Sequence, residues 1–313
     1  MGRFILKRLA LALVTLILVS MAVFAVSQLH GDVGRIILGP YASPDAVARV
    51  DHQLGVDQPL PVRYWKWATA FVRGDWGQSY LLNTPVRAMA LTRLVNSLIL
   101  AGFAFILIVP ISIGLGVVAA LSHGKVLDRL ITVMGLSLIA LPEFVSGVVL
   151  LVIFAVALKW LPASANVPSW NPADIIHQLL LPSIPLMFVL FGYIARMARA
   201  GTISTLDSNY VRTAVLKGLP RRVVIFRHVL RNSLLPTITV VFVQAGYLVG
   251  GLVVIETLFS YPGIGKLVFD SAQGHDVPML EATVLLIAII YMVANLSADV
   301  LYAVLNPRVR LSD

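Results

Sequence analysis

Long apolar runs alternate with short polar stretches along the whole chain. Runs long enough to cross a hydrocarbon core of about 30 Å as helix occur at 4–29, 97–121, 130–158, 179–200, 236–257 and 281–304. The pattern predicts an all-α integral membrane protein with six transmembrane helices. A cleaved signal peptide is the rival interpretation of the first run. Its apolar part, Leu9 to Val26, exceeds the usual length of about 7–15 residues, which favours a retained anchor.

Composition agrees with this class. Of the 313 residues, 58% are hydrophobic and 12% are charged, against roughly a quarter charged in soluble domains. The absence of cysteine excludes disulfides, thiolate metal sites and cysteine nucleophiles. The histidines show no helical ligand spacing and no HExxH motif, so neither a metal site nor a catalytic site is predicted. They are His30, His52, His123, His177, His228 and His275.

The distribution of Lys and Arg predicts the orientation, because positive residues near span ends stay inside the cell. Basic residues gather at the N-terminus, in the 122–129 loop, in the 196–235 loop and in the tail. They are Arg3, Lys7, Arg8, Lys125, Arg129, Arg196, Arg199, Arg212, Lys217, Arg221, Arg222, Arg227, Arg231, Arg308 and Arg310. Both termini and the large basic loop are therefore predicted to be cytoplasmic.

Residues 30–95 interrupt the membrane pattern and predict a small helical extracytoplasmic segment. Ser43 and Pro44 mark a helix start, and Gly55 marks its end. A second helix is predicted from Pro61 to about Arg73. One side of it carries Tyr64, Trp65, Ala68 and Phe71. Anchoring at the headgroup level and local packing are favoured for these aromatic residues over ligand binding.

The basic stretch from Tyr210 to Pro236 carries the strongest functional signal. Its pattern predicts two short helices with a bend at Gly218, the second starting at Pro220. In the second helix Val223, Phe226 and Leu230 share one face, which is predicted to pack, while Arg227 and Arg231 lie elsewhere. A loop that only sets topology needs charge but no hinge, so a docking helix pair is favoured. Nucleic-acid binding is disfavoured because both ends of the loop are tethered to the bilayer.

The segments YVRTA and AVLKGLPRR in this stretch resemble the cytoplasmic "EAA" coupling loop of ABC-importer permeases. The likeness is to the dipeptide/oligopeptide/nickel branch and its DppB/OppB-type subunit. Ala214 and Gly218 keep the Ala-x3-Gly spacing of that loop, whereas Arg212 and Thr213 replace its first Glu and Ala, and Leu230-Arg231 stands at the place of its Leu-Pro. Three further blocks resemble the same branch: 54–80, 256–265 and 306–310.

The resemblance implies a type I ABC importer permease fold. The expected organisation is an N-terminal transmembrane helix at 1–29, an extracytoplasmic segment at 30–95, a permease core at 96–305 with its coupling loop at 201–235, and a cytoplasmic tail at 306–313. The expected residues for coupling to the ATPase are Tyr210, Arg212, Ala214, Gly218, Arg221 and Arg222.

The same resemblance implies a non-catalytic subunit in the bacterial cytoplasmic (inner) membrane that imports di- or oligopeptides or related small solutes. The implied partners are a second homologous permease of DppC/OppC type, two cytoplasmic ABC ATPases, an extracytoplasmic solute-binding protein and the lipid bilayer, with no nucleic acid. No cofactor is expected in this chain, because ATP and Mg would bind the ATPases. A nickel chelate, glutathione or an oligosaccharide are alternative cargoes.

Other residues carry weaker signals. Gly265-Lys266 lacks the Gly and the Ser or Thr that a phosphate-binding loop needs, so a Gly-rich turn opening onto a short loop is favoured. Glu143, which follows Pro142 near the middle of the third run, would line the translocation path or bond a neighbouring helix, and both interpretations stay open. Glu256 is the other candidate for the path or a gate, with capping or pairing favoured for it and for Asp299.

Two pairs of small residues predict close helix contacts, either within the subunit, which is the default, or with a second permease. They are Gly246 with Gly250 and Ser112 with Gly116. A stand-alone secondary transporter should show matched broken helices with ionisable groups at mid-membrane, and only Glu143 approaches this. A membrane scaffold would need no hinge in its basic loop.

Overall fold

The computed structural model describes residues 2–28, 33–39, 41–55, 57–166, 169 and 171–305. These residues form helices and loops without a β-strand, apart from one isolated bridge between Gln78 and Pro85. The C-terminal block 306–310 and the tail 306–313 lie outside the described residues. By its contacts the chain divides into two compact units. One comprises Ile99–Tyr261 and the chain from Val293, and the other comprises Gly2–Leu98 and Pro262–Met292.

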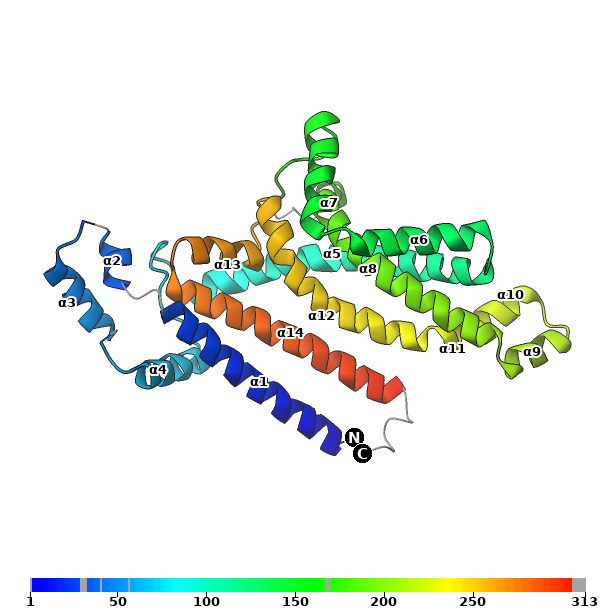
Figure 1. Cartoon of the computed structure of the whole chain (residues 1–313), viewed down its shortest axis with the longest axis horizontal. Coiled ribbons are helices and arrows are strands. Elements are labelled where there is room, and N and C mark those ends of the chain that lie inside the picture. Colours follow the sequence, from blue (N-terminus) through cyan, green and yellow to red (C-terminus); the bar gives the residue numbers. More distant parts are fainter. Residues whose placement is uncertain are drawn as a thin grey trace. The chain divides into compact units, whose positions relative to one another are not determined.

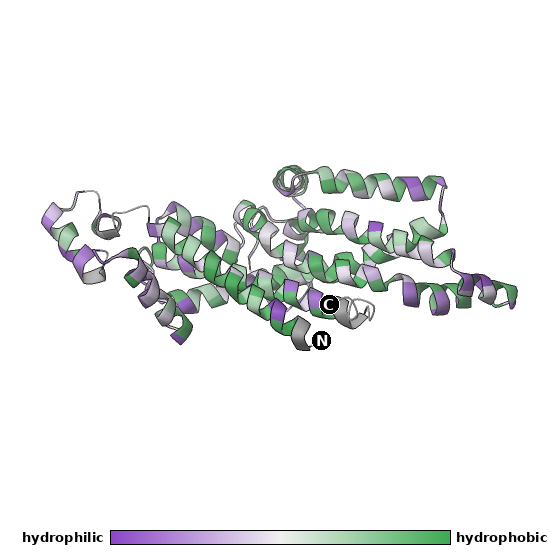
Figure 2. Cartoon of the chain, turned by 60° about the horizontal axis from the view of Figure 1, so that its bottom comes forward, coloured by the Kyte–Doolittle hydropathy of each residue, from purple (hydrophilic) through white to green (hydrophobic). Residues whose placement is uncertain are grey.

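The unit that comprises Gly2–Leu98 and Pro262–Met292 contains the predicted extracytoplasmic segment. Its helices are α1 (Gly2–Gln28), α2 (Val33–Leu38), α3 (Pro44–Leu54), α4 (Leu60–Arg73) and α13 (Ile264–Gln273), with the first parts of α5 (Val86–Leu121) and α14 (Val277–Leu305). Its core contains Val86, Leu267, Met279 and Ala282, against which Trp76 packs. Large apolar side chains are exposed along α1, and Figure 2 shows this helix green for most of its length from the end marked N. Such a surface suits contact with lipid.

The two short helices of the extracytoplasmic segment form as the sequence predicts. The Ser43 side chain accepts a hydrogen bond from the Ala46 amide at the start of α3. Gly55 and Gly74 end α3 and α4 in the left-handed conformation that favours glycine, with φ of 68° and 88°. Trp65 is 70% exposed, so it does not take part in local packing, and its anchoring at the headgroup level stays a prediction. Trp67 packs instead, and its ring lies 5.4 Å from that of Phe24.

The other unit is built around α8 (Pro172–Leu206), which packs against α6 (Val126–Ala140), α7 (Glu143–Leu150) and α12 (Leu235–Leu258). A π-helical segment, η1 (Leu151–Ala157), continues α7 (Figure 1). Fully buried Leu190, Ile194 and Leu252 lie in its core. Helix α8 therefore forms the central element of this unit.

Close backbone approaches explain why α8 packs so tightly. A Cβ atom at Gly192 would clash with the Gly135 carbonyl oxygen of α6, and one at Gly116 would clash with the Ala195 carbonyl oxygen of α8. The prediction of an internal contact at Ser112 and Gly116 is thus confirmed. An internal contact at Gly250 is not found, because a Cβ atom there would meet nothing within 4 Å, and contact of Gly250 with a second permease stays a prediction.

Within the described part of the chain, four helices are long and apolar enough to cross a membrane: Ile5–Gln28, Val86–Leu121, Pro172–Leu206 and Val277–Leu301. Two bent helix pairs bring the number to six if each pair is one span. They are Val126–Ala140 with Glu143–Ala157 and Arg221–Ser233 with Leu235–Leu248. The first pair was predicted as one span with a kink, but its two helices are bent by 101°. Pro142 lacks an amide hydrogen and forces Leu141 into an extended conformation, which ends α6.

The structure also corrects the predicted positions of Glu143 and of the pair Gly265 and Lys266. Glu143 does not lie mid-way along a continuous helix, but in the first turn of α7, where the helix dipole favours a negative charge. Gly265 and Lys266 were expected in a turn that opens onto a short loop. They belong to α13, a helix of ten residues, and Lys266 pairs with Asp270 at 2.8 Å.

Candidate functional site

The basic loop forms a compact bend that we call the elbow, residues 209–233. It consists of α9 (Asn209–Leu216), α10 (Arg221–Val223), the π-helical segment η2 (Val224–Val229) and α11 (Leu230–Ser233). In Figure 1 it extends from the end of α8, and Figure 2 shows hydrophilic residues gathered on it beside mainly apolar helices. The prediction of two short helices separated by a bend is confirmed.

The Ala-x3-Gly spacing has a direct structural explanation. Gly218 follows the last turn of α9 with φ of 74°, and its amide donates to the Val215 carbonyl over 2.9 Å. The Leu219 amide reaches back to the Ala214 carbonyl over 3.4 Å. These two bonds make a Schellman motif, in which the left-handed residue stands four positions after the carbonyl that closes the outer bond. Ala214 and Gly218 therefore belong to the same helix C-terminus. Ala214 accepts the outer hydrogen bond of the motif, and Gly218 is its left-handed residue.

A small apolar cluster holds the two arms of the elbow together. Val211 and Ala214 of α9 are buried against Val224 and Val229 of η2. Ala214 has little room, which accounts for a small side chain here. At the outer edge the Asn232 amide donates to the Tyr210 hydroxyl over 3.1 Å and ties α11 to α9. Apolar packing inside the elbow and a hydrogen bond at its edge therefore hold the two arms together.

The packing face predicted for the second arm is wrong. Val223 is exposed and Phe226 is 71% exposed, whereas Val224 and Val229 are buried. The π-helical geometry of η2 places more residues in each turn than an α-helix does, so a 3.6-residue period assigns the wrong face. The apolar residues that were expected to pack are available for a partner instead.

The exposed surface of the elbow is both basic and apolar. Six basic side chains are exposed on it: Arg212, Lys217, Arg221, Arg222, Arg227 and Arg231. Leu216 is 81% exposed beside Phe226. A cavity of about 450 Å³ lies under the bend, lined by Leu206, Val211 and Leu219 among others. The sequence analysis did not predict that Leu216 and Phe226 are exposed. An apolar side chain within a strongly charged helix could have indicated a contact surface for a partner.

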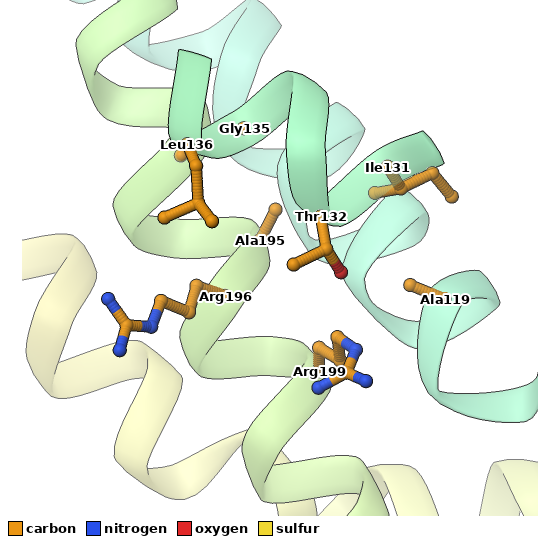
Figure 3. A pocket seen from close by; sticks show the side chains of 9 residues that line it. Ala119, Ile131, Thr132, Gly135, Leu136, Ala195, Arg196 and Arg199 are labelled. Atoms are coloured by element: carbon orange, nitrogen blue, oxygen red, sulfur yellow. The ribbon is translucent and has the colours of Figure 1, made fainter. Parts of the chain in front are cut away.

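An ion pair fixes the helices that carry the elbow. Arg199 of α8 donates from Nε to Asp128 Oδ1 over 2.5 Å and from Nη2 to Asp128 Oδ2 over 2.8 Å. The Gly124 amide adds a third bond to the same carboxylate, at 3.0 Å. Arg199 was counted from the sequence among the basic residues that set topology, and the structure shows that it also forms this ion pair. Arg196 and Arg199 both line a pocket of about 230 Å³ between α6 and α8, and Figure 3 shows their side chains extending in different directions.

The elbow is also fixed directly to α8. A Cβ atom at Gly201 would clash with the Ser233 carbonyl oxygen of α11. Thr202 of α8 donates to the Ser233 hydroxyl over 3.4 Å, and both residues are buried. The elbow and the central helix of the unit are therefore in direct backbone contact.

The two acidic candidates occupy different positions in the helix bundle. The Glu143 carboxylate of α7 lies against α12, where a Cβ atom at Gly251 would be 2.5 Å from its Oε2. Glu256 is fully buried near the end of α12. Burial, followed by the nearby charge of Glu256, raises the pKa of the Tyr261 hydroxyl in the loop that follows. Glu143 thus meets a neighbouring helix, while Glu256 sits at the turn that closes α12.

Comparison with known proteins identifies the family. Residues 112–311 match the family model described as Binding-protein-dependent transport system inner membrane component. Residues 1–101 match the corresponding N-terminal model, Binding-prot-dependent transport system membrane comp, N-term. The chain belongs to this family. It is the permease subunit of an ABC importer and a multi-pass protein of the inner membrane, with the type I permease fold that the resemblance implied.

Full-length relatives place the permease in the peptide/nickel branch. It is 36% identical over 311 residues to the Glutathione transport system permease proteins GsiC of Salmonella paratyphi A and Salmonella typhimurium, and each match covers 99% of both chains. The corresponding protein of Escherichia coli (strain K12) is 35% identical over the same length. The family resemblance stated from the coupling loop is therefore confirmed.

Proposed function

We propose that the elbow is the element through which this permease receives force from a cytoplasmic ATPase. The observation that carries the proposal is a bend whose two arms are held together by packing and a hydrogen bond, and which displays exposed apolar and basic side chains together. Leu216 and Phe226 offer apolar anchors, and the surrounding arginines suit an acidic rim on a partner. Interfaces commonly combine an apolar centre with a polar rim in this way.

The contributions of the predicted coupling residues follow from their positions. Ala214 and Gly218 hold the bend, and Tyr210 ties its arms through Asn232. Arg212, Arg221 and Arg222 are exposed and face the partner. ATP-driven closure of the ATPases moves the elbow as a lever, and the backbone contact at Gly201 passes the movement to α8. The spans then change the side of the membrane to which the path is open.

The proposal includes the rest of the importer. A second homologous permease completes the path, two ATPases bind ATP and Mg, and an extracytoplasmic binding protein delivers the solute. Both termini and the elbow face the cytoplasm, as the distribution of Lys and Arg favours. The cargo is a small peptide. The relatives are named as glutathione permeases, and glutathione is itself a tripeptide.

Single-cysteine labelling tests the docking surface and the orientation together, because the chain has no cysteine of its own. We expect Leu216→Cys to cross-link to the ATPase in the assembled importer. It should react with a membrane-impermeant maleimide only in inverted vesicles. The cross-linked product should be absent when the ATPase is omitted from the assembly.

A matched control comes from the opposite end of the polypeptide. Val72 of α4 is 86% exposed and apolar, so Val72→Cys should react from the outside and give no ATPase cross-link. Labelling of residue 216 from the outside would refute the topology. Labelling from the inside without any cross-link would leave the topology standing and refute the docking surface. Uptake of a nickel chelate or an oligosaccharide, with no uptake of peptides, would overturn the proposed cargo.

A further inference from the structure

The unit that contains the extracytoplasmic segment holds a second pocket, remote in sequence from the elbow. Its volume is about 420 Å³, and α1, α3, α4, the loop after α4 and the start of α14 all contribute to it. This size is typical of small-ligand sites. On the proposed topology the pocket opens on the extracytoplasmic side.

A buried carboxylate lies in the wall of this pocket. Glu281 of α14 is 2% exposed. Ser27 donates to its Oε1 over 2.5 Å, and Gln28 donates to the same oxygen over 3.1 Å. Among the described residues none donates to Oε2. Oε2 is not among the fully enclosed side-chain atoms without a partner in the described residues, so it keeps contact with solvent and can accept a hydrogen bond or a cation from outside the chain.

The remaining lining complements a solute that carries both charges. Arg63 donates to Gln28, which links it to Glu281. Lys66 supplies a second positive charge, and Asp75 a second negative one. The pocket lining therefore has two acidic and two basic side chains, which favours a zwitterion over an ion of one sign.

Aromatic side chains form the apolar part of the wall. Trp67 lies 5.4 Å from Phe24 and 5.7 Å from Phe71, between ring centres. Phe71 stacks on Trp76 at 4.6 Å. Aromatic faces attract ammonium groups and also pack against apolar side chains. They place apolar surface beside the charged side chains of the pocket, which suits a short peptide better than an inorganic ion.

A tyrosine adds a hydrogen-bond donor to the same pocket. Tyr80 lines it, and burial together with the charges of Glu281 and Asp276 raises the pKa of Tyr80 to about 12. The hydroxyl therefore stays protonated at neutral pH. Its backbone amide is fixed by Asp276, which accepts from it over 3.2 Å. The loop that carries Tyr80 is thus held in place beside Glu281.

We propose that this pocket binds the free amino terminus of a short peptide, with the ammonium group at Glu281 Oε2 and the carboxylate toward Arg63 and Lys66. The permease would then recognise its solute before translocation. This inference rests on the proposed peptide cargo, but it adds a binding site in this chain. The pocket belongs to one unit, so the site needs no second subunit to be complete.

The test is equilibrium binding of dialanine to the full-length chain in nanodiscs, without ATPases or binding protein. Trp67 and Trp76 line the pocket, so tryptophan fluorescence reports occupancy. We expect saturable binding of dialanine, and affinity at least tenfold weaker for N-acetyl-dialanine and for the Glu281→Gln variant. Glutamine retains an acceptor for Ser27 and Gln28 but lacks the negative charge. Asp270→Asn, on the exposed side of α13, is the matched control and should bind as the wild type does.

Two results would overturn the inference. Equal affinity for dialanine and its N-acetyl form in the wild type would do so without any variant, which covers the possibility that Glu281→Gln fails to fold. Absence of dialanine binding would do so as well. Uptake of dialanine by the complete importer separates the two proposals. Uptake without binding to this chain refutes the pocket alone, whereas neither uptake nor binding refutes the peptide cargo too.

Discussion

Replacement of Gly218 by valine is the sharpest test of the elbow. Gly218 adopts φ of 74°, a left-handed conformation that costs most other residues about 1–2 kcal/mol. A Cβ atom at this position would meet nothing within 4 Å. The whole effect therefore comes from the backbone, not from a clash. A cost of this size lowers the population of the bent conformation about 5- to 30-fold.

The assay is solute-stimulated ATP hydrolysis and uptake by the complete importer in proteoliposomes. Gly218→Val should lower both, since the Schellman bonds to Val215 and Ala214 would be lost with the bend. Gly218→Asn should stay close to wild type, because asparagine tolerates the left-handed region. Membrane insertion should be unchanged in both variants.

A second left-handed glycine provides the control. Gly39 has φ of 88°, and a Cβ atom there would also meet nothing within 4 Å. Gly39→Val imposes the same kind of backbone strain outside the elbow and its supporting ion pair, so it should cost similar stability while hydrolysis stays coupled to uptake. The reasoning fails if both valine variants behave alike, or if Gly218→Asn is as defective as Gly218→Val.

Three further substitutions test the packing that supports the elbow. Gly192→Ala should destabilise the protein by about 1–3 kcal/mol, because the new methyl group overlaps a backbone carbonyl of α6; thermal unfolding in detergent measures this. Asp128→Asn should cost about 3 kcal/mol in the same assay, since it leaves the partly buried guanidinium of Arg199 without its counter-charge. Gly251→Ala should displace the Glu143 carboxylate from its place on α12, and transport should fall while expression is retained.

Each of these changes has a neutral counterpart in the same chain. Gly114→Ala and Gly250→Ala add a methyl group where no atom lies within 4 Å, so neither should lower stability or uptake. Asp270→Asn breaks an exposed pair with Lys266 and should change stability by less than about 1 kcal/mol. Equal effects of a test variant and its counterpart would contradict the packing argument for that site.

Local signals in the sequence were sufficient for much of the fold. The apolar runs located the long helices, and Ser43, Gly55 and Gly74 marked helix ends where the structure has them. The Ala-x3-Gly spacing located the bend at Gly218. These features depend on hydrogen bonds and sterics within a few residues, so they can be read from neighbouring letters.

Other features depend on geometry that no short window of sequence contains. Pro142 marks the position of the bend between α6 and α7 but not its size of 101°, and both helices pack against α8. The π-helical turns of η2 moved the buried face to Val224 and Val229. Period-based reasoning assumes a regular α-helix and could not detect this change.

The amino-acid sequence by itself determined that this chain is a helical membrane protein with a hinged basic loop, because hydrophobicity and helix termination act locally. Only the tertiary structure decided which side chains meet. Glu281 joins Ser27 across 254 positions of sequence, and Glu143 meets Gly251 on another helix. Such contacts arise from the collective packing of helices, whose energy is shared among many distant residues.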